Sequence, residues 1–130
     1  MRLADLVHEA KQARMNARAP YSGFKVGAAL ETRAGKIFTG CNVENSSYGL
    51  TVCAERVAVW KAISEGESNF RRILILSDSE QPAPPCGACR QIIWEYCGDI
   101  EVILANLKGC RTRHRMKRLL PLAFDKSCLE

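Results

Sequence analysis

Ile73-Leu74-Ile75-Leu76, at the centre of the run Arg72–Ser77, is the stretch that decides the fold class of this 130-residue chain. Consecutive apolar residues over such a short run are typical of a strand buried on both faces. A predicted helix follows at about Gly87–Cys97, closed by Gly98, and Ile100–Ala105 repeats the buried-strand pattern. This order of elements predicts a sheet with helices packed on its faces.

The residues before this unit predict two further strands and two further helices. Lys25–Thr32 and Ile37–Val43 have the composition of strands, and Arg33–Lys36 between them predicts a hairpin turn. Apolar residues recur at helical spacing from Leu3 to Ala17, which predicts a first helix that ends before Pro20. A second helix is expected at about Cys53–Glu65. Together with a short last helix near 116–120, the chain is therefore predicted to be α/β, with a mixed sheet.

Composition limits the class of protein. Apolar residues make up 47% of the chain and charged residues 25%, which excludes intrinsic disorder and suits one globular domain. No apolar run reaches the roughly 18–20 residues of a membrane span, and Met1–Ala10 lacks the apolar centre of a signal peptide. There are seven cysteines, an odd number that argues against a disulfide scaffold. We therefore expect a cytoplasmic protein without a membrane partner, in which a metal holds some of the thiols.

The net charge of +5 is concentrated in one short segment. The basic segment, residues 111–118, holds five basic residues and no acidic one: Arg111, Arg113, Arg115, Lys117 and Arg118. Without these five, 14 basic residues face 14 acidic ones, so the charge alone is no signature of nucleic-acid binding. We interpret the basic segment as a solvated surface, with an anionic partner as the alternative.

Three cysteines form the first chemical signal. Cys86 and Cys89 lie three residues apart at a predicted helix start, where their side chains share one side and the helix dipole favours thiolates. By itself this pair would also fit half of a structural zinc site, a redox pair or two buried residues. Cys53 begins another predicted helix, and three thiolates leave one tetrahedral position open, which is typical of catalytic zinc. A fourth ligand would instead make the site structural, and the remaining cysteines available for it are Cys41, Cys97, Cys110 and Cys128.

Two charged residues next to Cys53 are candidates for supporting roles. A zinc ion with three thiolates is negatively charged, and Arg56 lies on the same helical face as Cys53, so we hypothesise that Arg56 donates to the thiolates. An exposed surface arginine is the alternative. Glu55 is the candidate proton carrier, although residues i and i+2 of an ideal helix point about 200° apart. Either Cys53 lies at the helix cap or Glu55 reaches the zinc from the side.

In combination, these motifs resemble the zinc-dependent nucleoside and base deaminases, and the small cytidine deaminases in particular. Cys-Ala-Glu at 53–55 and Pro-Cys-Gly-Ala-Cys at 85–89 carry the first resemblance. The similar stretches extend over nearly the whole chain, at 19–30, 40–45, 53–56, 85–91 and 119–124. The resemblance implies one cytidine deaminase-like catalytic domain over residues 1–130, with three layers (α-β-α) and a mixed five-stranded sheet.

The resemblance also implies the chemistry. Cys53, Cys86 and Cys89 would hold one Zn²⁺ per subunit, with water or hydroxide as the fourth ligand, and Glu55 would shuttle protons. Attack of zinc-bound hydroxide at C4 would convert cytidine and 2′-deoxycytidine to uridine and 2′-deoxyuridine, with release of ammonia, in pyrimidine salvage.

The substrate contacts follow in the same way. Phe24 would pack on the pyrimidine, Asn42 and Glu44 would hold the ribose hydroxyls, and Ala54 would contact the substrate. The spacing of Asn42 and Glu44 agrees with joint binding of the ribose hydroxyls, because residues i and i+2 of an extended segment face the same side. A polar strand end that closes a turn is the alternative for this pair.

The family implies a partner as well. Its small members are typically homotetramers, in which Tyr48, the Ser46 backbone and Phe124 would complete the pocket of a neighbouring subunit. A polynucleotide deaminase would have the same fold, but its first ligand is generally in a His-x-Glu motif, so nucleic acid is not the expected partner. The motifs would also fit a deaminase of a modified cytosine nucleoside or, without catalysis, a zinc-stabilised interaction module.

The basic segment is where the chain departs most from the family. Family members usually have Thr-Val-x-Glu before Leu-Leu-Pro, whereas this chain has Arg115-Met116-Lys117-Arg118 before Leu119-Leu120-Pro121. The resemblance therefore does not predict three features: the final strand, the start of the last helix and the packing of Phe124.

Overall fold

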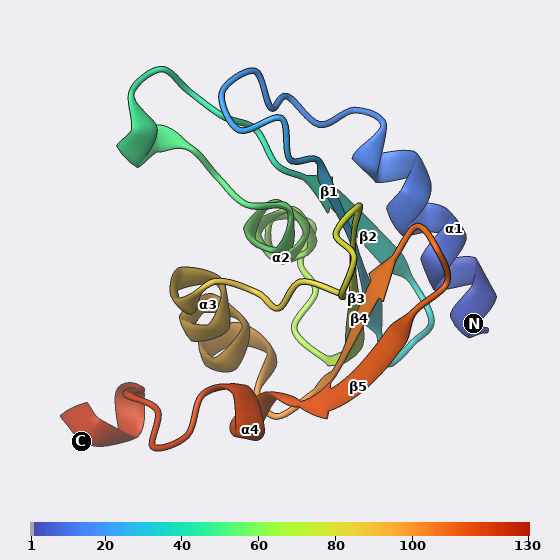
Figure 1. Cartoon of the computed structure of the whole chain (residues 1–130). Helices are drawn as coiled ribbons and strands as arrows, with labels where there is room; N and C mark the ends of the chain where they lie inside the picture. Colours follow the sequence, from blue (N-terminus) through green and yellow to red (C-terminus); the bar gives the residue numbers. More distant parts are fainter. Residues whose placement is uncertain (1) are drawn as a thin grey trace.

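The computed structural model describes residues 2–130 and contains one five-stranded sheet in the order β2-β1-β3-β4-β5 (Figure 1). The strands are β1 Val26–Thr32, β2 Ile37–Cys41, β3 Phe70–Ser77, β4 Glu101–Asn106 and β5 Arg111–Arg115. β3 and β4 run parallel, while β1 is antiparallel to both β2 and β3, and β5 is antiparallel to β4. The predicted mixed sheet is confirmed.

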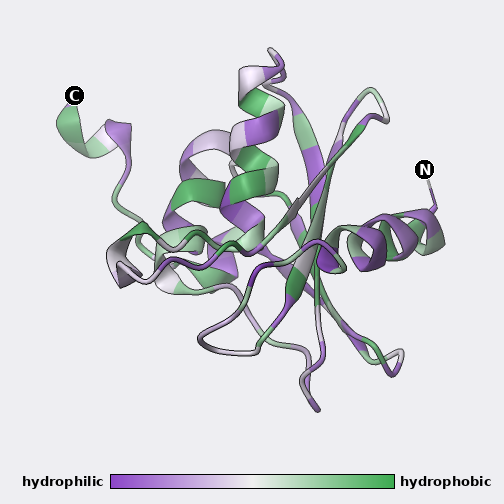
Figure 2. Cartoon of the chain, turned by 90° about the horizontal axis from the view of Figure 1, so that it is seen from above, coloured by the Kyte–Doolittle hydropathy of each residue, from purple (hydrophilic) through white to green (hydrophobic). Residues whose placement is uncertain are grey.

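Helices cover both faces of this sheet. α1 (Leu3–Arg14) lies alone on one face, and α2 (Ala54–Ser64) and α3 (Gly87–Cys97) lie side by side on the other (Figure 2). The predicted three-layer arrangement is therefore confirmed. The shorter helices are η1 Tyr48–Leu50, α4 Met116–Leu119 and η2 Lys126–Leu129. Within residues 2–130, no helix has both the length and the apolar character to cross a lipid bilayer.

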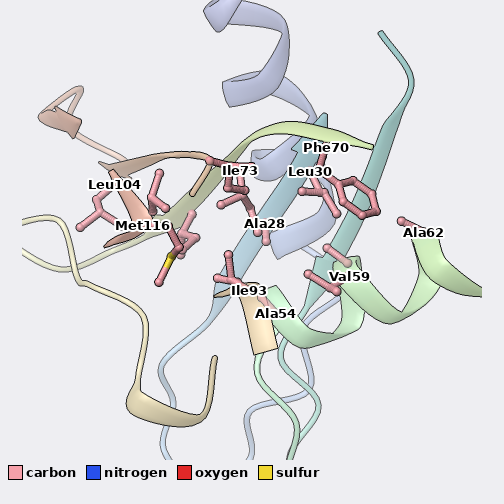
Figure 3. Packing of buried hydrophobic residues seen from close by; sticks show 14 residues of the cluster. Ala28, Leu30, Ala54, Val59, Ala62, Phe70, Ile73, Ile93, Leu104 and Met116 are labelled. Atoms are coloured by element: carbon pink, nitrogen blue, oxygen red, sulfur yellow. The ribbon is translucent and has the colours of Figure 1, made fainter. Parts of the chain in front are cut away.

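The apolar run of β3 connects the two halves of the core. Ile73 and Ile75 point toward α2 and α3, in the cluster that also holds Leu30, Val59, Phe70 and Ile93 (Figure 3). Leu74 and Leu76 point the other way, toward α1. Burying each such side chain stabilises the fold by roughly 1.5–3 kcal/mol. The absence of alternation at residues 73–76 thus reflects burial of β3 on both faces.

Two glycines allow the helices to approach the sheet closely. A Cβ atom on Gly40 of β2 would lie 2.4 Å from the Ala54 carbonyl oxygen of α2, and one on Gly27 of β1 would lie 2.0 Å from the Ala10 oxygen of α1. Neither position has room for a side chain. Gly40 therefore sets how close the start of α2 lies to the sheet.

The basic segment forms an edge strand and the short helix after it. Residues 111–115 are β5, and the hairpin with β4 pairs Ile103 with Arg113 and Glu101 with Arg115. Arg111, Arg113 and Arg115 are exposed, as expected for a solvated surface. Ion pairs of 3.4 Å between Arg113 and Glu101 and of 3.6 Å between Arg115 and Asp99 offset part of the charge. Charged residues on an edge strand also discourage pairing with other chains.

Element boundaries differ from the predictions where tertiary hydrogen bonds intervene. α1 ends at Arg14 rather than just before Pro20, because the chain turns so that the Arg18 N–H donates to the Asn42 carbonyl and the Glu44 N–H donates to the Arg18 carbonyl. β2 ends at Cys41 rather than Val43. These tertiary hydrogen bonds bring residues 18–24 next to residues 42–44.

Candidate active site

The three predicted zinc ligands meet where the N-termini of α2 and α3 converge. Cys53 is the N-cap residue of α2 and Cys86 is the N-cap residue of α3, while Cys89 lies in the first turn of α3. These helices begin beside the carboxyl ends of β2 and β3, at Cys41 and Ser77. A ligand crevice in α/β proteins usually lies at such strand ends. The fold thus joins cysteines that are 33 residues apart in the chain.

The sulfur positions fit a tetrahedral metal ion. The Sγ atoms of Cys53 and Cys86 are 3.8 Å apart, those of Cys86 and Cys89 are 3.4 Å apart, and all three lie within 4.8 Å of one another. Zinc–sulfur bonds of about 2.3 Å in a tetrahedron require sulfur separations of about 3.8 Å. In the described part of the chain, no other acidic, histidine or cysteine side chain joins this cluster. The donor set therefore leaves a fourth position open.

Crowding of the sulfurs changes their acidity. A hydrogen bond from Cys89, together with Arg56, lowers the pKa of Cys53 to about 5. The same contact with Cys53, with burial, raises the pKa of Cys89. These contacts favour the thiolate form of Cys53, which the helix N-terminus at which it lies stabilises further. A divalent cation would hold all three sulfurs as thiolates.

Arg56 lies where the sequence predicted it. One of its terminal nitrogens donates to Cys53 Sγ at 3.5 Å, and its guanidinium lies 5.9 Å from the centre of the Trp60 ring. The contact with Cys53 raises the pKa of Arg56, so the side chain stays positively charged. Its buried Nε atom has no hydrogen-bond partner among the described residues. The positive charge of Arg56, in contact with Cys53, offsets part of the negative charge of a three-thiolate site.

Glu55 is buried in the first turn of α2, with 4% of its surface exposed. Burial raises its pKa to about 7, and the negative charge of Cys53 adds to this effect. The angular conflict between residues 53 and 55 is resolved because Cys53 has extended backbone angles as the N-cap residue. A carboxyl group with a pKa near neutrality can both accept and donate a proton.

A cavity of about 260 Å³ opens beside the cysteines. Six predicted residues besides Cys86 line it, and they are Phe24, Asn42, Glu44, Cys53, Ala54 and Glu55. Ser46, Tyr48 and Phe124 are absent from the described lining of this cavity. Tyr48 is 76% exposed and packs edge-on against Tyr21, with ring centres 5.9 Å apart. The chain thus brings together the predicted metal and pyrimidine residues but leaves three predicted contacts outside.

Asn42 and Glu44 hold the loop that carries Phe24. The Asn42 amide donates to the Phe24 carbonyl at 2.8 Å and accepts from the Val26 N–H at 2.9 Å. Glu44 accepts from the N–H groups of Tyr21 and Ser22, each at 3.0 Å, and from the Ser22 hydroxyl. These bonds, those from Ser22 foremost, lower the pKa of Glu44. Both side chains keep hydrogen-bonding capacity for a ligand, because a carboxylate has about four acceptor positions and an amide about two donors and two acceptors.

Several lining residues were not singled out from the sequence. They are Ser22, Val26, Thr51, Val52, Ile75, Ser77, Ala83 and Pro84. Ser77 had a usable signal, because it directly follows the apolar run of β3 and so lies at the carboxyl end of a central strand. Thr51 and Val52 had none, since their position depends on the bridge between Val43 and Val52.

Comparison with known proteins agrees with this geometry. Residues 2–105 match the family described as the cytidine and deoxycytidylate deaminase zinc-binding region. The cytidine deaminase of Sporosarcina psychrophila is 48% identical over 130 residues, covering 99% of this chain and 96% of that one. That of Halalkalibacterium halodurans is 50% identical over 120 residues, covering 92% of this chain and 91% of that one. The crystal structure of cytidine deaminase from Burkholderia pseudomallei superposes with a TM-score of 0.93 at 47% identity, over 95% of this chain and all of that one.

The relatives cover nearly the whole chain, and the family match at residues 2–105 spans the positions of the three cysteines and Glu55. A family defined by its zinc-binding region also explains why three thiolates with an open fourth position gather at two helix N-termini. The chain belongs to the zinc-dependent cytidine and deoxycytidylate deaminase family, with Cys53, Cys86 and Cys89 as the cluster that fits its zinc ion.

Proposed function

We propose that this chain catalyses the hydrolytic deamination of cytidine and 2′-deoxycytidine to uridine and 2′-deoxyuridine, with release of ammonia. The observation that carries the proposal is the burial of Glu55 against a cavity whose wall also holds Cys53 and Cys86. A carboxyl group beside an open zinc position is the arrangement that deamination of cytosine requires.

In this reaction Glu55 moves the protons. A zinc ion held by Cys53, Cys86 and Cys89 would lower the pKa of a water molecule and so supply the nucleophile for C4. Glu55 would take a proton from that water and deliver it to N3 of the base. It would then take the remaining proton from the hydroxyl now on C4 and pass it to the departing amino group, so that C4 keeps a carbonyl and ammonia leaves. Its pKa of about 7 suits both directions of transfer, because the group is neither strongly acidic nor strongly basic at neutral pH.

The other lining residues orient the nucleoside. Phe24 packs on the pyrimidine, Ala54 contacts the base, and the free hydrogen-bonding positions of Asn42 and Glu44 take ribose hydroxyls. Glu44 already accepts three hydrogen bonds, which leaves about one acceptor position for the sugar. Asn42 keeps about one donor and one acceptor position in addition. We include 2′-deoxycytidine among the substrates because the resemblance to the cytidine deaminases implies it.

The substitution Glu55→Gln tests the assignment. The amide keeps the shape of the side chain but cannot carry the proton, so we expect loss of at least about a hundredfold in kcat. Zinc content and nucleoside binding should stay at the level of the unchanged protein. The measurements are loss of cytidine absorbance, zinc analysis and calorimetric binding of uridine. A fully active Glu55→Gln protein would contradict the proposed role.

Substrate class is tested by comparing cytidine with a single-stranded oligonucleotide and with a modified cytosine nucleoside. We expect cytidine and 2′-deoxycytidine to be the preferred substrates. Faster turnover of cytosine in the oligonucleotide, or of the modified nucleoside, would contradict the proposal.

We also propose that residues 1–130 act as one catalytic domain and assemble as a homotetramer in the cytoplasm. Exposed apolar side chains near the cavity mouth (Tyr21, Tyr48 and Leu50) and near the C-terminus (Leu122 and Phe124) support an assembly. In this assembly Ser46, Tyr48 and Phe124 would complete a neighbour's pocket. The unbridged thiols among the described residues suit a reducing compartment. Analytical ultracentrifugation tests the assembly, and a fully active monomer would contradict shared sites.

A further inference from the structure

α3 carries two zinc ligands and also holds the C-terminal segment, defined here as residues 119–125. Cys86 and Cys89 lie at its N-terminal end, and three side chains farther along the same helix bind the C-terminal segment. The side chains are those of Arg90, Gln91 and Trp94. The zinc site and the C-terminal segment are thus attached to a single helix.

Arg90 contacts both of these parts. Its Nε donates to the Pro85 carbonyl at 2.8 Å, and one terminal nitrogen donates to the Leu119 carbonyl at 2.7 Å. Hydrogen bonds this short from a charged guanidinium are stronger than those between neutral groups, and the planar fork fixes the direction of both. A single side chain therefore links the residue before Cys86 to the start of the C-terminal segment.

The hydrogen bond from Arg90 to the Pro85 carbonyl restrains the ψ angle of Pro85. The proline ring fixes φ of Pro85, but ψ, which orients its carbonyl and the following Cys86, is not fixed by the ring. The Arg90 side chain binds that carbonyl, while the Arg90 N–H donates to the Cys86 carbonyl at 2.9 Å. Two consecutive carbonyls are thus held by one residue, and the Cys86 side chain is directed toward Cys53 and Cys89.

The C-terminal segment depends on α3 for polar anchoring. The Gln91 amide donates to the Phe124 carbonyl at 2.8 Å, and the Trp94 indole donates to Asp125 at 2.9 Å. Leu119 and Leu120 pack against the core, but Pro121, Leu122 and Phe124 are exposed, so burial contributes little to holding the part beyond Leu120. The position of residues 121–125 therefore follows the position of α3.

We propose that Arg90 is a positioning residue that fixes the direction of the Cys86 thiolate and couples occupancy of the zinc site to docking of the C-terminal segment. Coupling of this kind is reciprocal. Zinc retention depends on Arg90, and zinc in turn keeps residues 119–125 docked on α3. The proposal concerns zinc retention and docking of the C-terminal segment, not turnover, so it can fail or succeed independently of the proposed reaction.

The first experiment measures zinc release from the holoenzyme into a chromophoric chelator. Arg90→Met keeps the length of the side chain without its donors, and we expect zinc release at least about tenfold faster, as is typical when a group that orients a ligand is lost. Arg90→Lys keeps the charge but cannot span both carbonyls, so its release rate should be intermediate. Gln91→Ala removes only a contact to the C-terminal segment, and exposed Arg71→Met is the matched arginine control. Arg71→Met should release zinc at the unchanged rate, whereas Gln91→Ala, which weakens docking alone, should speed release by less than Arg90→Met does.

The second experiment measures amide hydrogen exchange in residues 119–125 with and without zinc. Removal of zinc should speed exchange in the unchanged protein, and it should have little further effect in Arg90→Met, where the link is already broken. If Arg90→Met does not fold, Arg90→Lys serves for both measurements. Two results would overturn the proposal. One is an unchanged rate of zinc release in folded Arg90 variants; the other is amide exchange in residues 119–125 of the unchanged protein that is the same with and without zinc.

Discussion

The backbone conformation of Cys53 decides whether the neighbouring residues can act together. In a helix interior, the side chains of residues 53 and 55 would point in opposite directions. As the extended N-cap residue of α2, Cys53 instead directs its sulfur toward Cys86, while Glu55 enters the cavity from the first turn. The conformation of this one cap residue thus places the Cys53 sulfur and the Glu55 carboxyl at the same cavity.

Replacement of Arg56 tests charge compensation at this cap. Arg56→Gln removes the positive charge that contacts Cys53, so the three-thiolate site becomes more negative and activates water less readily. We expect turnover to fall about 10–100-fold, with Arg56→Lys retaining more activity because it keeps the charge. Steady-state kinetics on zinc-loaded protein measure both. If Arg56→Gln has the kcat of the unchanged protein, Arg56 is merely a packing residue.

Ser22 controls the charge of Glu44. Because the hydrogen bond from its hydroxyl is the largest cause of the lowered pKa of Glu44, Ser22→Ala should move that pKa upward toward its ordinary value. Glu44 would then become protonated at a higher pH, so nucleoside affinity should begin to fall earlier as the pH decreases. Carbon-13 NMR titration of the Glu44 carboxyl and uridine binding between about pH 4 and 7 measure the shift. Ser68→Ala on the surface is the control, and an unshifted Glu44 titration would contradict the expectation.

At the scale of elements, the spacing between β2 and α2 determines the site. The absence of a side chain at Gly40 lets the first turn of α2, with Ala54 and Glu55, lie directly on the sheet. Gly27 has the same role for α1, but on the opposite face and away from the cysteines. The two glycines therefore form a matched pair for separating stability from site geometry.

Alanine at each glycine should give different results. Gly40→Ala and Gly27→Ala should each lower the free energy of unfolding by about 1–3 kcal/mol, because the added methyl group overpacks the interface. Gly40→Ala should in addition lower turnover per bound zinc, because it displaces Glu55 from the cavity. Thermal unfolding, zinc content and kcat of the two variants decide this. Equal kcat values in the two variants would show that α2 adjusts without moving the site.

At the scale of the whole molecule, the basic segment is separated from the site. β5 is the edge strand, two strands away from β3, whose end lines the cavity. Its arginines are exposed, and two of them pair with Glu101 and Asp99. The charge excess of the sequence therefore belongs to one edge of the sheet.

Salt should have little effect on the reaction as a result. Cytidine is uncharged, so screening of the basic segment leaves its capture unchanged, and kcat/KM should vary by less than about twofold between 0.05 and 0.5 M salt. Steady-state kinetics at constant pH measure kcat/KM at each salt concentration. The double variant Arg111→Gln, Arg113→Gln, with a less basic segment, should show the same small salt dependence. A steep fall of kcat/KM with salt would instead point to a charged substrate or an anionic partner.

Local patterns in the sequence determined the class of the fold and the chemistry of the site. The doubly buried run of β3, the helix starts at Cys53 and Cys86, and the Cys86–Cys89 pair depend on neighbouring residues, whose periodicity and chemistry are visible in the sequence. The combination of Cys53 and Glu55 with that pair was predicted from the resemblance of the motifs to a known family. Only the tertiary structure decided that the basic segment pairs as an edge strand, because its arginines carry no burial pattern. It also decided that Asn42 and Glu44 hold the Phe24 loop and that Arg90 joins Pro85 to Leu119. Those bonds connect segments that are distant in the chain, and their partners are set by packing rather than by sequence spacing.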